Sequence, residues 1–283
     1  MRGRRAALYP SRMPSDIASI ALLFLAASRA ATAVPEAPAI VHHMKEALEP
    51  ARSSTRKLTI VVSVQSGQAA QWLAGQARQK RGDGSRMLTV ILAPEDARGL
   101  AILVEDRGDE ADRQWVYVPA VRRVREISRV EAYQAFLNTD FTYADLGFVN
   151  PRERYELLGT EQRDGVQTYK VQAVPREQWY YSRIVTWVAA DSWLPTRREF
   201  HDPAGLLWKV ETWGTVARID GVPIPMLDKM EDVRQGGSTE IRVSDVLWDR
   251  ELPSALFDPK NLPEAASSPV WGADSPGERQ ASN

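Results

Sequence analysis

The sequence contains no cysteine among its 283 residues. This absence excludes disulfide bonds, thiolate metal sites and cysteine nucleophiles, and it leaves no cysteine to which a lipid anchor could be attached. Histidine is scarce as well, with only His42, His43 and His201. His42 and His43 are neighbours in a segment with a helical pattern, so their side chains diverge by about 100° and cannot hold one ion together. We therefore expect no metal site.

The sequence also lacks the local motifs of the common enzyme classes. It contains no Gly-x-Ser-x-Gly elbow, no phosphate-binding glycine loop and no dinucleotide-binding fingerprint. The acidic run of residues 106–112 lacks the twelve-position pattern of a calcium-binding loop, and a solvated hairpin loop is the simpler interpretation. Asp140 and Asp145 are candidate acid–base groups, but no base, nucleophile or metal completes a catalytic constellation. The sequence thus predicts neither catalysis nor a cofactor.

No apolar run reaches the roughly 20 residues that a membrane-spanning helix requires. An apolar run covers residues 17–27, follows several arginines and precedes Ala31-Thr32-Ala33. This order is typical of a secretory signal peptide with small residues at its cleavage site. We expect a signal peptide over residues 1–33, with cleavage after Ala33. An uncleaved anchor, or a true start at Met13, is the alternative.

The charge balance bears on binding to nucleic acid, and the composition of the C-terminus predicts where the folded domain ends. Removal of residues 1–33 takes five arginines and one aspartate from totals of 36 basic and 37 acidic residues, so the mature chain is mildly acidic. Such a chain has no global attraction for nucleic acid. Residues 264–283 are rich in Ser, Pro, Ala, Gly and charge, and we expect them to be a disordered tail. Residues 34–263 are then the folded domain.

What the chain has in excess is aromatic residues, with nine tryptophans and eight tyrosines. Residues 35–50 carry apolar side chains at helical spacing, whereas the pattern from residue 57 onward has a period of two. Residues 128–138 break this alternation, which indicates a short amphipathic helix or irregular loop that acts as a lid. The predicted strands cover residues 57–65, 69–78, 86–92, 100–105, 114–118, 154–162, 166–174, 183–190, 195–201, 206–217, 222–233 and 239–248.

Residues 112–147 carry the most informative pattern. A tryptophan strand, Trp115-Val116-Tyr117-Val118-Pro119, is followed by the cluster Arg122-Arg123-Val124-Arg125 and then by Asp140-Phe141-Thr142-Tyr143-Ala144-Asp145-Leu146-Gly147. Gly159-x-Glu161, Trp193-Leu194-Pro195 and Leu252-Pro253-x-x-x-Phe257 follow in order. In order and spacing, these pieces resemble the outer-membrane lipoprotein-sorting-like proteins, relatives of the periplasmic carrier LolA. The resemblance covers residues 85–262.

This resemblance implies a fold and a function. The fold would be mainly β with a few helices, an incomplete antiparallel β-barrel (half-barrel) capped by helices that enclose an apolar cavity. The protein would be a periplasmic carrier that binds a lipoprotein acyl chain or another lipid-like hydrophobe and passes it between membranes. Its expected partners are an inner-membrane transporter and an outer-membrane acceptor, and it needs no cofactor. The segment before Gly82 follows the family pattern only loosely, so the cargo need not be a lipoprotein.

The sequence gives two sets of candidate site residues. We expect the hydrophobe to be bound by Trp115, Tyr117, Leu137, Phe141, Tyr143, Trp187 and Trp208; for each aromatic residue among them, plain packing in the core is the alternative. We expect a lipid head group or a partner protein to be contacted by Arg122, Arg123 and Arg125; a solvated sheet edge is the alternative, and alternation places Arg122 on the opposite face from Arg123 and Arg125. For Asp140, Thr142 and Asp145 the sequence favours a turn or cap.

Other functions use the same fold. An envelope-stress sensor could detect a mislocalised lipid in the same cavity, although such regulators usually have a second domain. An accessory protein docked on a transporter would fill the cavity with its own side chains. A hydrolase would need polar groups inside the cavity, and the sequence names none.

Overall fold

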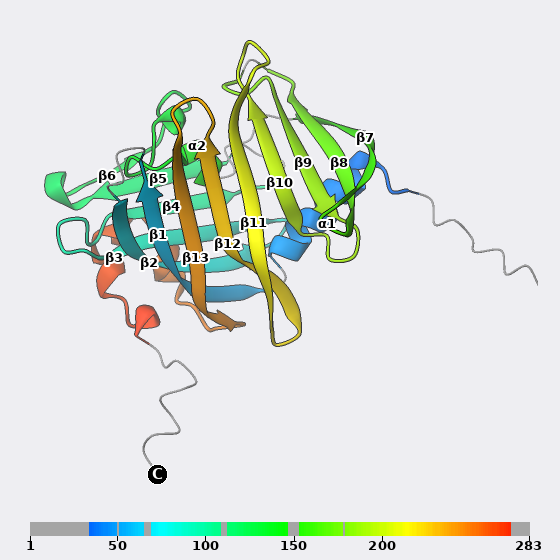
Figure 1. Cartoon of the computed structure of the whole chain (residues 1–283). Coiled ribbons are helices and arrows are strands. Elements are labelled where there is room, and N and C mark those ends of the chain that lie inside the picture. Colours follow the sequence, from blue (N-terminus) through cyan, green and yellow to red (C-terminus); the bar gives the residue numbers. More distant parts are fainter. Residues whose placement is uncertain are drawn as a thin grey trace, which may run out of the picture. The chain divides into compact units, whose positions relative to one another are not determined.

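An antiparallel β-sheet of 13 strands organises the structure (Figure 1), a computed structural model that describes residues 34–49, 51–64, 69–108, 112–146, 153–177 and 179–272. The strand order is β6-β5-β4-β3-β2-β1-β13-β12-β11-β10-β9-β8-β7. Because this order ends at β6 and β7, the sheet is open. The strands are β1 (Ser53–Ser63), β2 (Ala69–Arg81), β3 (Gly84–Ala93), β4 (Ala101–Asp106), β5 (Arg113–Val118), β6 (Arg123–Glu126), β7 (Glu153–Arg163), β8 (Val166–Pro175), β9 (Arg183–Ala189), β10 (Pro195–His201), β11 (Leu207–Ile219), β12 (Val222–Asp232) and β13 (Gly237–Trp248).

The prediction of a mainly β chain with an incomplete antiparallel sheet is confirmed. Each predicted strand coincides with an observed one, because alternating apolar and polar residues place one face of each strand against the core. The sequence did not predict β6, whose arginines and glutamate lie at an edge where no apolar alternation is required. The predicted signal peptide and its cleavage site, as well as Gly147, lie outside the described residues.

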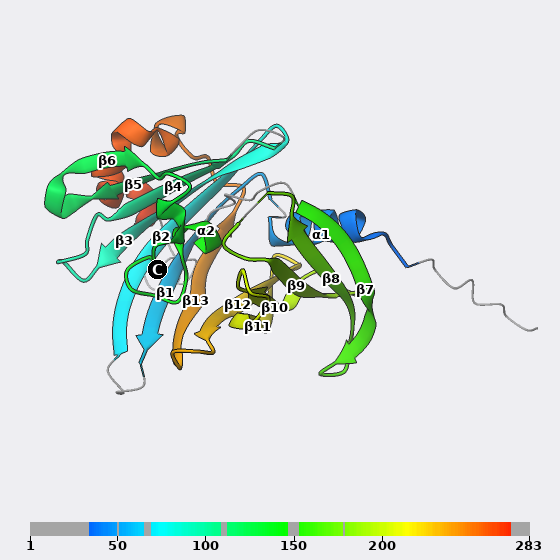
Figure 2. The ribbon, with the colours of Figure 1, turned by 90° about the horizontal axis from the view of Figure 1, so that it is seen from above.

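The sheet has two covered faces in its N-terminal half, here called inner and outer. On the inner face, Ile102, Val104 and Val116 pack against residues 127–146, which contain η2 (Glu131–Tyr133) and α2 (Tyr143–Leu146). On the outer face, Leu103 and Trp115 pack against residues 252–271, here called the C-terminal segment. Figure 2 shows α2 within the curve of the sheet and the red C-terminal segment on the opposite side. Neighbouring residues of one strand thus belong to different cores, as a period of two requires.

Residues 127–146 form a mostly irregular cover. The N–H of Phe136 donates to the carbonyl of Phe141 over 2.9 Å, and Ala135 forms a bridge with Thr142. Phe136 and Tyr143 are buried against the inner face. Of the two predicted forms of this segment, the irregular loop describes it better than an amphipathic helix.

Helix α1 (Ala37–Leu48) begins with a proline in its first turn, where the missing N–H costs nothing. It buries Ala37, Ile40 and Met44, which pack with Val171 of β8 and Val188 of β9. The predicted helical spacing of residues 35–50 is therefore correct to within two residues at either end. Among the described residues, no helix has both the length and the apolar character that crossing a membrane would demand.

The C-terminal segment continues further than we predicted. It contains η3 (Ser254–Phe257), η4 (Pro259–Ser267) and η5 (Pro269–Trp271), and it buries Phe257, Leu262 and Ala265 against the outer face. Residues 264–272 are thus part of the fold, because Ala265 and Trp271 provide the apolar contact that composition alone concealed. Residues 273–283 of the predicted disordered tail lie outside the described residues.

Candidate hydrophobe-binding cavity

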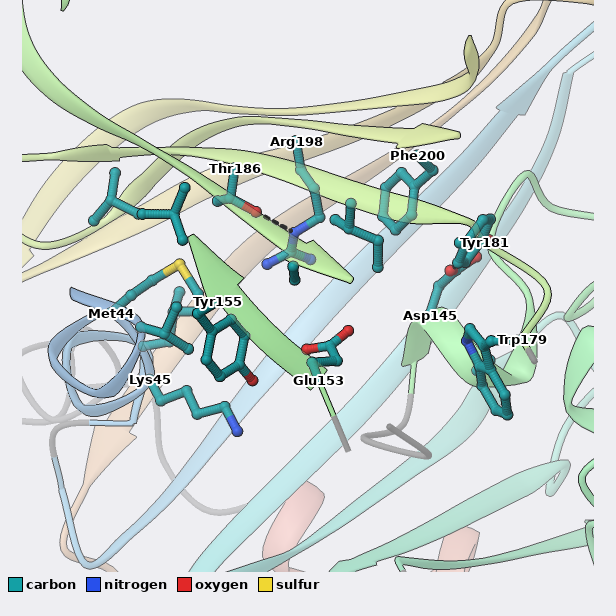
Figure 3. Close-up of a pocket in the computed structure, with 17 residues that line it drawn as sticks. Met44, Lys45, Asp145, Glu153, Tyr155, Trp179, Tyr181, Thr186, Arg198 and Phe200 are labelled. Atoms are coloured by element: carbon teal, nitrogen blue, oxygen red, sulfur yellow. Dashed lines mark hydrogen bonds between the residues drawn. The ribbon is translucent and has the colours of Figure 1, made fainter. Parts of the chain in front are cut away.

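A cavity of about 140 Å³ lies between α1 and the inner face of strands β7–β10 (Figure 3). Val41, Met44 and Leu48 face it from α1, where a spacing of three to four residues places them on one side of the helix. Ile184, Thr186 and Val188 face it from β9, where alternate residues share one side of the strand. Val171 and Ala173 extend this wall along β8. The apolar face of α1 and the apolar faces of β8 and β9 therefore line the same cavity.

Aromatic side chains close one end of the cavity. Trp179 and Tyr181, from the loop between β8 and β9, line it together with Phe200 of β10. The ring centroids of Tyr181 and Phe200 are 4.9 Å apart, and Phe141 packs in the same cluster. Aromatic pairs at such distances add to the stability gained from burial. This end wall is consequently made by rigid groups from several elements.

A buried ion pair fixes the aromatic wall. The Nζ of Lys209 lies 2.8 Å from one carboxylate oxygen of Asp145, and their side chains are only 4% and 3% exposed. The Tyr181 hydroxyl donates to the other oxygen over 2.9 Å. Burial, followed by the charge of Asp145, raises the pKa of Tyr181 well above its usual value, so this hydroxyl keeps its proton. Asp145 thus joins α2, β11 and the β8–β9 loop.

Asp145 also caps α2, as the sequence suggested for Thr142 and Asp145. The N–H of Thr142 donates to the Asp145 carboxylate over 2.8 Å, and the N–H of Asp145 lies 3.2 Å from the Thr142 hydroxyl oxygen. This reciprocal arrangement satisfies two amides that the start of a helix leaves unpaired. Asp140 accepts a hydrogen bond from the Thr239 hydroxyl instead, over 2.7 Å. The turn-and-cap interpretation is correct for Thr142 and Asp145.

Arg198 of β10 is the main cation of the inner wall. Its guanidinium donates to Glu211 over 2.9 Å and to the Thr186 hydroxyl over 3.4 Å. Burial raises the pKa of Glu211 to about 7, against the opposing charge of Arg198. Burial and the nearby Glu211 raise the pKa of Asp228 well above its usual value. This region therefore carries less negative charge at neutral pH than its carboxyl groups imply.

A second polar group, Glu153, faces the cavity from the first residue of β7. Burial raises its pKa, and the Tyr155 hydroxyl together with the charges of Lys45 and Arg198 opposes that rise. Lys45 projects from the exposed side of α1 but lines the same cavity. The cavity thus has apolar walls and a small number of polar groups, which is the usual composition of small-molecule sites.

The structure does not bring the predicted hydrophobe-binding residues together. Phe141 belongs to the aromatic wall, and Trp208 packs beside it. Leu137 and Tyr143 pack in the inner core of the N-terminal half of the sheet. Trp115 and Tyr117 pack under the C-terminal segment on the outer face, so they do not line this cavity.

Trp187 also points away from the cavity. Its strand neighbours Thr186 and Val188 line the cavity, so alternation places Trp187 on the outer face. There its indole N–H donates to Glu161, and the Nζ of Lys170 lies 4.6 Å from the ring centroid. This cation–π contact, together with the burial of the ring, accounts for a tryptophan on a charged face.

The predicted arginines lie around the β5–β6 hairpin. Arg122 is the C-cap of η1 (Pro119–Val121) and has a left-handed φ of 49°, while Arg123 begins β6. Both are exposed. Arg125 forms an ion pair with Glu131. These residues do not line the cavity, so they are not placed to contact a lipid head group there. Their contact with a partner protein stays a prediction.

Sequence reasoning missed the polar residues of the cavity, above all Lys45, Glu153 and Arg198. The sequence pattern does not distinguish them, because each is a charged residue on an amphipathic helix or strand, where charged residues usually face solvent. Arg198 could have been flagged, since it shares the face of Phe200 in a strand whose other face is also polar. The pairing of α1 with β8 and β9 has no signal in one sequence.

Comparisons with known proteins agree with this architecture. A family model described as uncharacterized-protein-like matches residues 83–264. No curated protein matches the chain. A putative outer membrane lipoprotein-sorting protein domain from Vibrio parahaemolyticus is 25% identical with a TM-score of 0.73, and the match covers 80% of this chain and 97% of that one.

Two further solved structures are similar. A DUF1329 family protein from Desulfovibrio piger is 25% identical with a TM-score of 0.73, with 81% of this chain and 100% of that chain covered. A LolA superfamily protein from Nitrosomonas europaea shares the fold at 23% identity and a TM-score of 0.65, with 80% and 98% covered. The family match over most of the chain and these neighbours confirm the resemblance seen in the sequence. The chain belongs to the family of the matched model, and it shares its fold with the lipoprotein-sorting protein domain and with the LolA superfamily protein.

Proposed function

We propose that this protein is a periplasmic carrier that holds the hydrocarbon part of a lipid or lipoprotein in the cavity under α1. The observation that carries the proposal is the meeting of two apolar faces, one on α1 and one on β8–β9, with open space between them. The similar structure from Vibrio parahaemolyticus is described as a putative outer membrane lipoprotein-sorting protein domain. Carriage of a lipid between membranes needs no catalytic group. Predicted secretion through residues 1–33 supports a periplasmic location.

The size of the cavity defines how cargo enters. Its volume of about 140 Å³ is smaller than the roughly 300–1,000 Å³ of ordinary ligand sites. Each methylene transferred from water gains about 0.8 kcal/mol, so a long chain can drive α1 away from the sheet as it enters. The binding is then reversible, because the apolar contacts of α1 are regained on release. A carrier that loads from one membrane partner and unloads to another needs this reversibility.

The proposal is tested by filling the cavity. Ala173 lines the cavity and its neighbour Gln172 is on the other face of β8, so Ala173→Phe and Gln172→Phe form a matched pair. Ala173→Phe should lower the affinity for a fluorescent fatty-acid probe at least about ten-fold, a loss of 1.4 kcal/mol. Gln172→Phe should leave the affinity unchanged. Circular dichroism verifies that both variants fold.

Cargo itself is sought by native mass spectrometry and lipid extraction of mature protein purified from the periplasm without detergent. A stoichiometric lipid would support the carrier and identify its cargo. Protein that is repeatedly empty and takes up no probe would contradict it, and an accessory protein docked on a transporter would then be the better interpretation.

A further inference from the structure

The charged groups of the cavity indicate which head group the cargo has. Lys45 and Arg198 face the cavity from opposite walls, one from α1 and one from β10 (Figure 3). Lys209 is a third cation nearby, but it is engaged at 2.8 Å by Asp145. Lys45 and Arg198 are therefore the cations positioned to meet a ligand.

Arg198 retains hydrogen-bonding capacity. A guanidinium has five N–H donors. The bonds to Glu211 and Thr186 engage its Nη1 and Nε atoms. The Nη2 atom has no hydrogen-bond partner among the described residues, and the side chain, which is 21% exposed, lines the cavity. Arg198 can therefore bind an anion in the cavity while its Nη1 keeps the bond to Glu211.

Glu153 shows that a carboxyl group is accommodated between these cations. The charges of both Lys45 and Arg198 favour its ionised form, so the carboxyl group lies within electrostatic range of both. Burial opposes that ionised form and raises the pKa of Glu153. Burial also raises the pKa of Glu211, the partner of Arg198, to about 7. Both carboxyl groups are therefore easier to protonate than exposed ones, so they neutralise Lys45 and Arg198 less completely than exposed carboxylates would.

We propose that the cargo is a single-chain amphiphile with an anionic head group, a carboxylate or a phosphate monoester, which binds Lys45 and Arg198 in the cavity beside Glu153. This inference rests on the proposed carrier function. The volume of about 140 Å³ supports a single chain, since several chains would require a far larger displacement of α1. The apolar surfaces of α1 and β9 take the chain, and the part of the cavity lined by Lys45 and Arg198 takes the head group.

The test compares head groups on one chain. Palmitate, a palmitoyl lysophosphatidate, hexadecanol and hexadecylamine compete with the fluorescent probe for mature protein at neutral pH. We expect one or both anions to bind at least about ten-fold more tightly than the alcohol, the equivalent of one charge-assisted hydrogen bond. Preference for palmitate over lysophosphatidate, or the reverse, identifies which anion is carried.

Two variants assign the recognition. Lys45→Gln should remove most of the preference for anions, and Glu153→Gln should strengthen anion binding several-fold because it removes the competing carboxylate. Neither should change the affinity for hexadecanol. Lys170→Gln makes the same charge change on the outer face and should change nothing.

Two results would overturn the inference. Equal affinities for all four compounds would exclude head-group recognition while leaving the carrier function intact. Tighter binding of hexadecylamine, weakened by Glu153→Gln, would make Glu153 the recognition group for a cation. Failure of all four compounds to displace the probe would instead count against the carrier function itself.

Discussion

At the scale of single residues, the buried ion pair of Asp145 and Lys209 predicts a large effect of a substitution on stability. Lys209→Met removes the cation and leaves the Asp145 carboxylate almost fully buried. Breaking one side of a buried pair typically costs about 3–5 kcal/mol. We expect a loss of that order in the free energy of unfolding measured in urea, together with disorder of the aromatic wall.

A matched control is available on the surface of β12. Lys229 lies 2.7 Å from Glu231, with side chains 32% and 44% exposed, so Lys229→Met should cost less than about 1 kcal/mol. Similar losses for the two variants would show that Tyr181 and Thr142 alone satisfy Asp145. The ion pair would then be unimportant for stability.

The buried carboxyl group of Glu211 predicts a pH dependence. Its pKa is about 7 in the folded protein, against an ordinary value of 4.5, and Asp228 shifts in the same direction. Between these values the folded state binds more protons than the unfolded state, so stability falls as pH rises from about 5 to 8. The charges facing Glu211 are those of Arg198, Asp228, Asp145 and Lys209.

Urea denaturation across this pH range checks the prediction. The wild-type protein should lose about 1–3 kcal/mol more than Glu211→Gln between pH 5 and 8, because the variant cannot release that proton. Parallel curves for the two proteins would mean that Glu211 titrates normally, with Arg198 compensating its burial.

At the scale of elements, the sequence predicts what local periodicity controls. Strands β7–β13 follow their predictions within a few residues because each alternates against a single core. Tertiary contacts decide the rest. The pattern of Trp115 and Tyr117 is that of any amphipathic strand, and it does not reveal that their partners are Phe257 and Leu262 on the outer face.

The C-terminal segment is a second element that local sequence conceals. Its apolar residues are too sparse for a core, yet Trp271 lies directly over Gly75 of β2. A Cβ atom at residue 75 would approach the Trp271 ring to 2.5 Å. Strand β2 therefore needs a residue without a side chain at this position for the segment to dock.

Gly75→Val should displace Trp271 and destabilise the protein by about 1–3 kcal/mol, the usual cost of overpacking. Limited proteolysis should then cleave the C-terminal segment faster. In a Trp271→Ala background the same substitution should cost much less, since the clashing ring is gone. An equal cost in both backgrounds would place the strain in β2 itself rather than in the contact with Trp271.

At the scale of the whole sheet, its two halves are covered differently. The N-terminal half is covered on both faces, by residues 127–146 inside and by the C-terminal segment outside. Among the described residues, α1 and the aromatic wall cover the inner face of β8 and β9, and there the cavity lies. The matched family region starts at residue 83, so α1 with Lys45 lies outside it.

The proposed cargo cavity and the predicted partner contact lie in different parts of the sheet. Arg122 and Arg123 lie on the hairpin that ends the sheet at β6, whereas the cavity lies against β7–β10 towards the other end of the strand order. The double substitution Arg122→Glu and Arg123→Glu should leave palmitate affinity within about two-fold of wild type, because exposed charges are screened over about 10 Å in salt. A loss of ten-fold or more would place these arginines at the cargo, and the cavity under α1 would no longer be sufficient as the binding site.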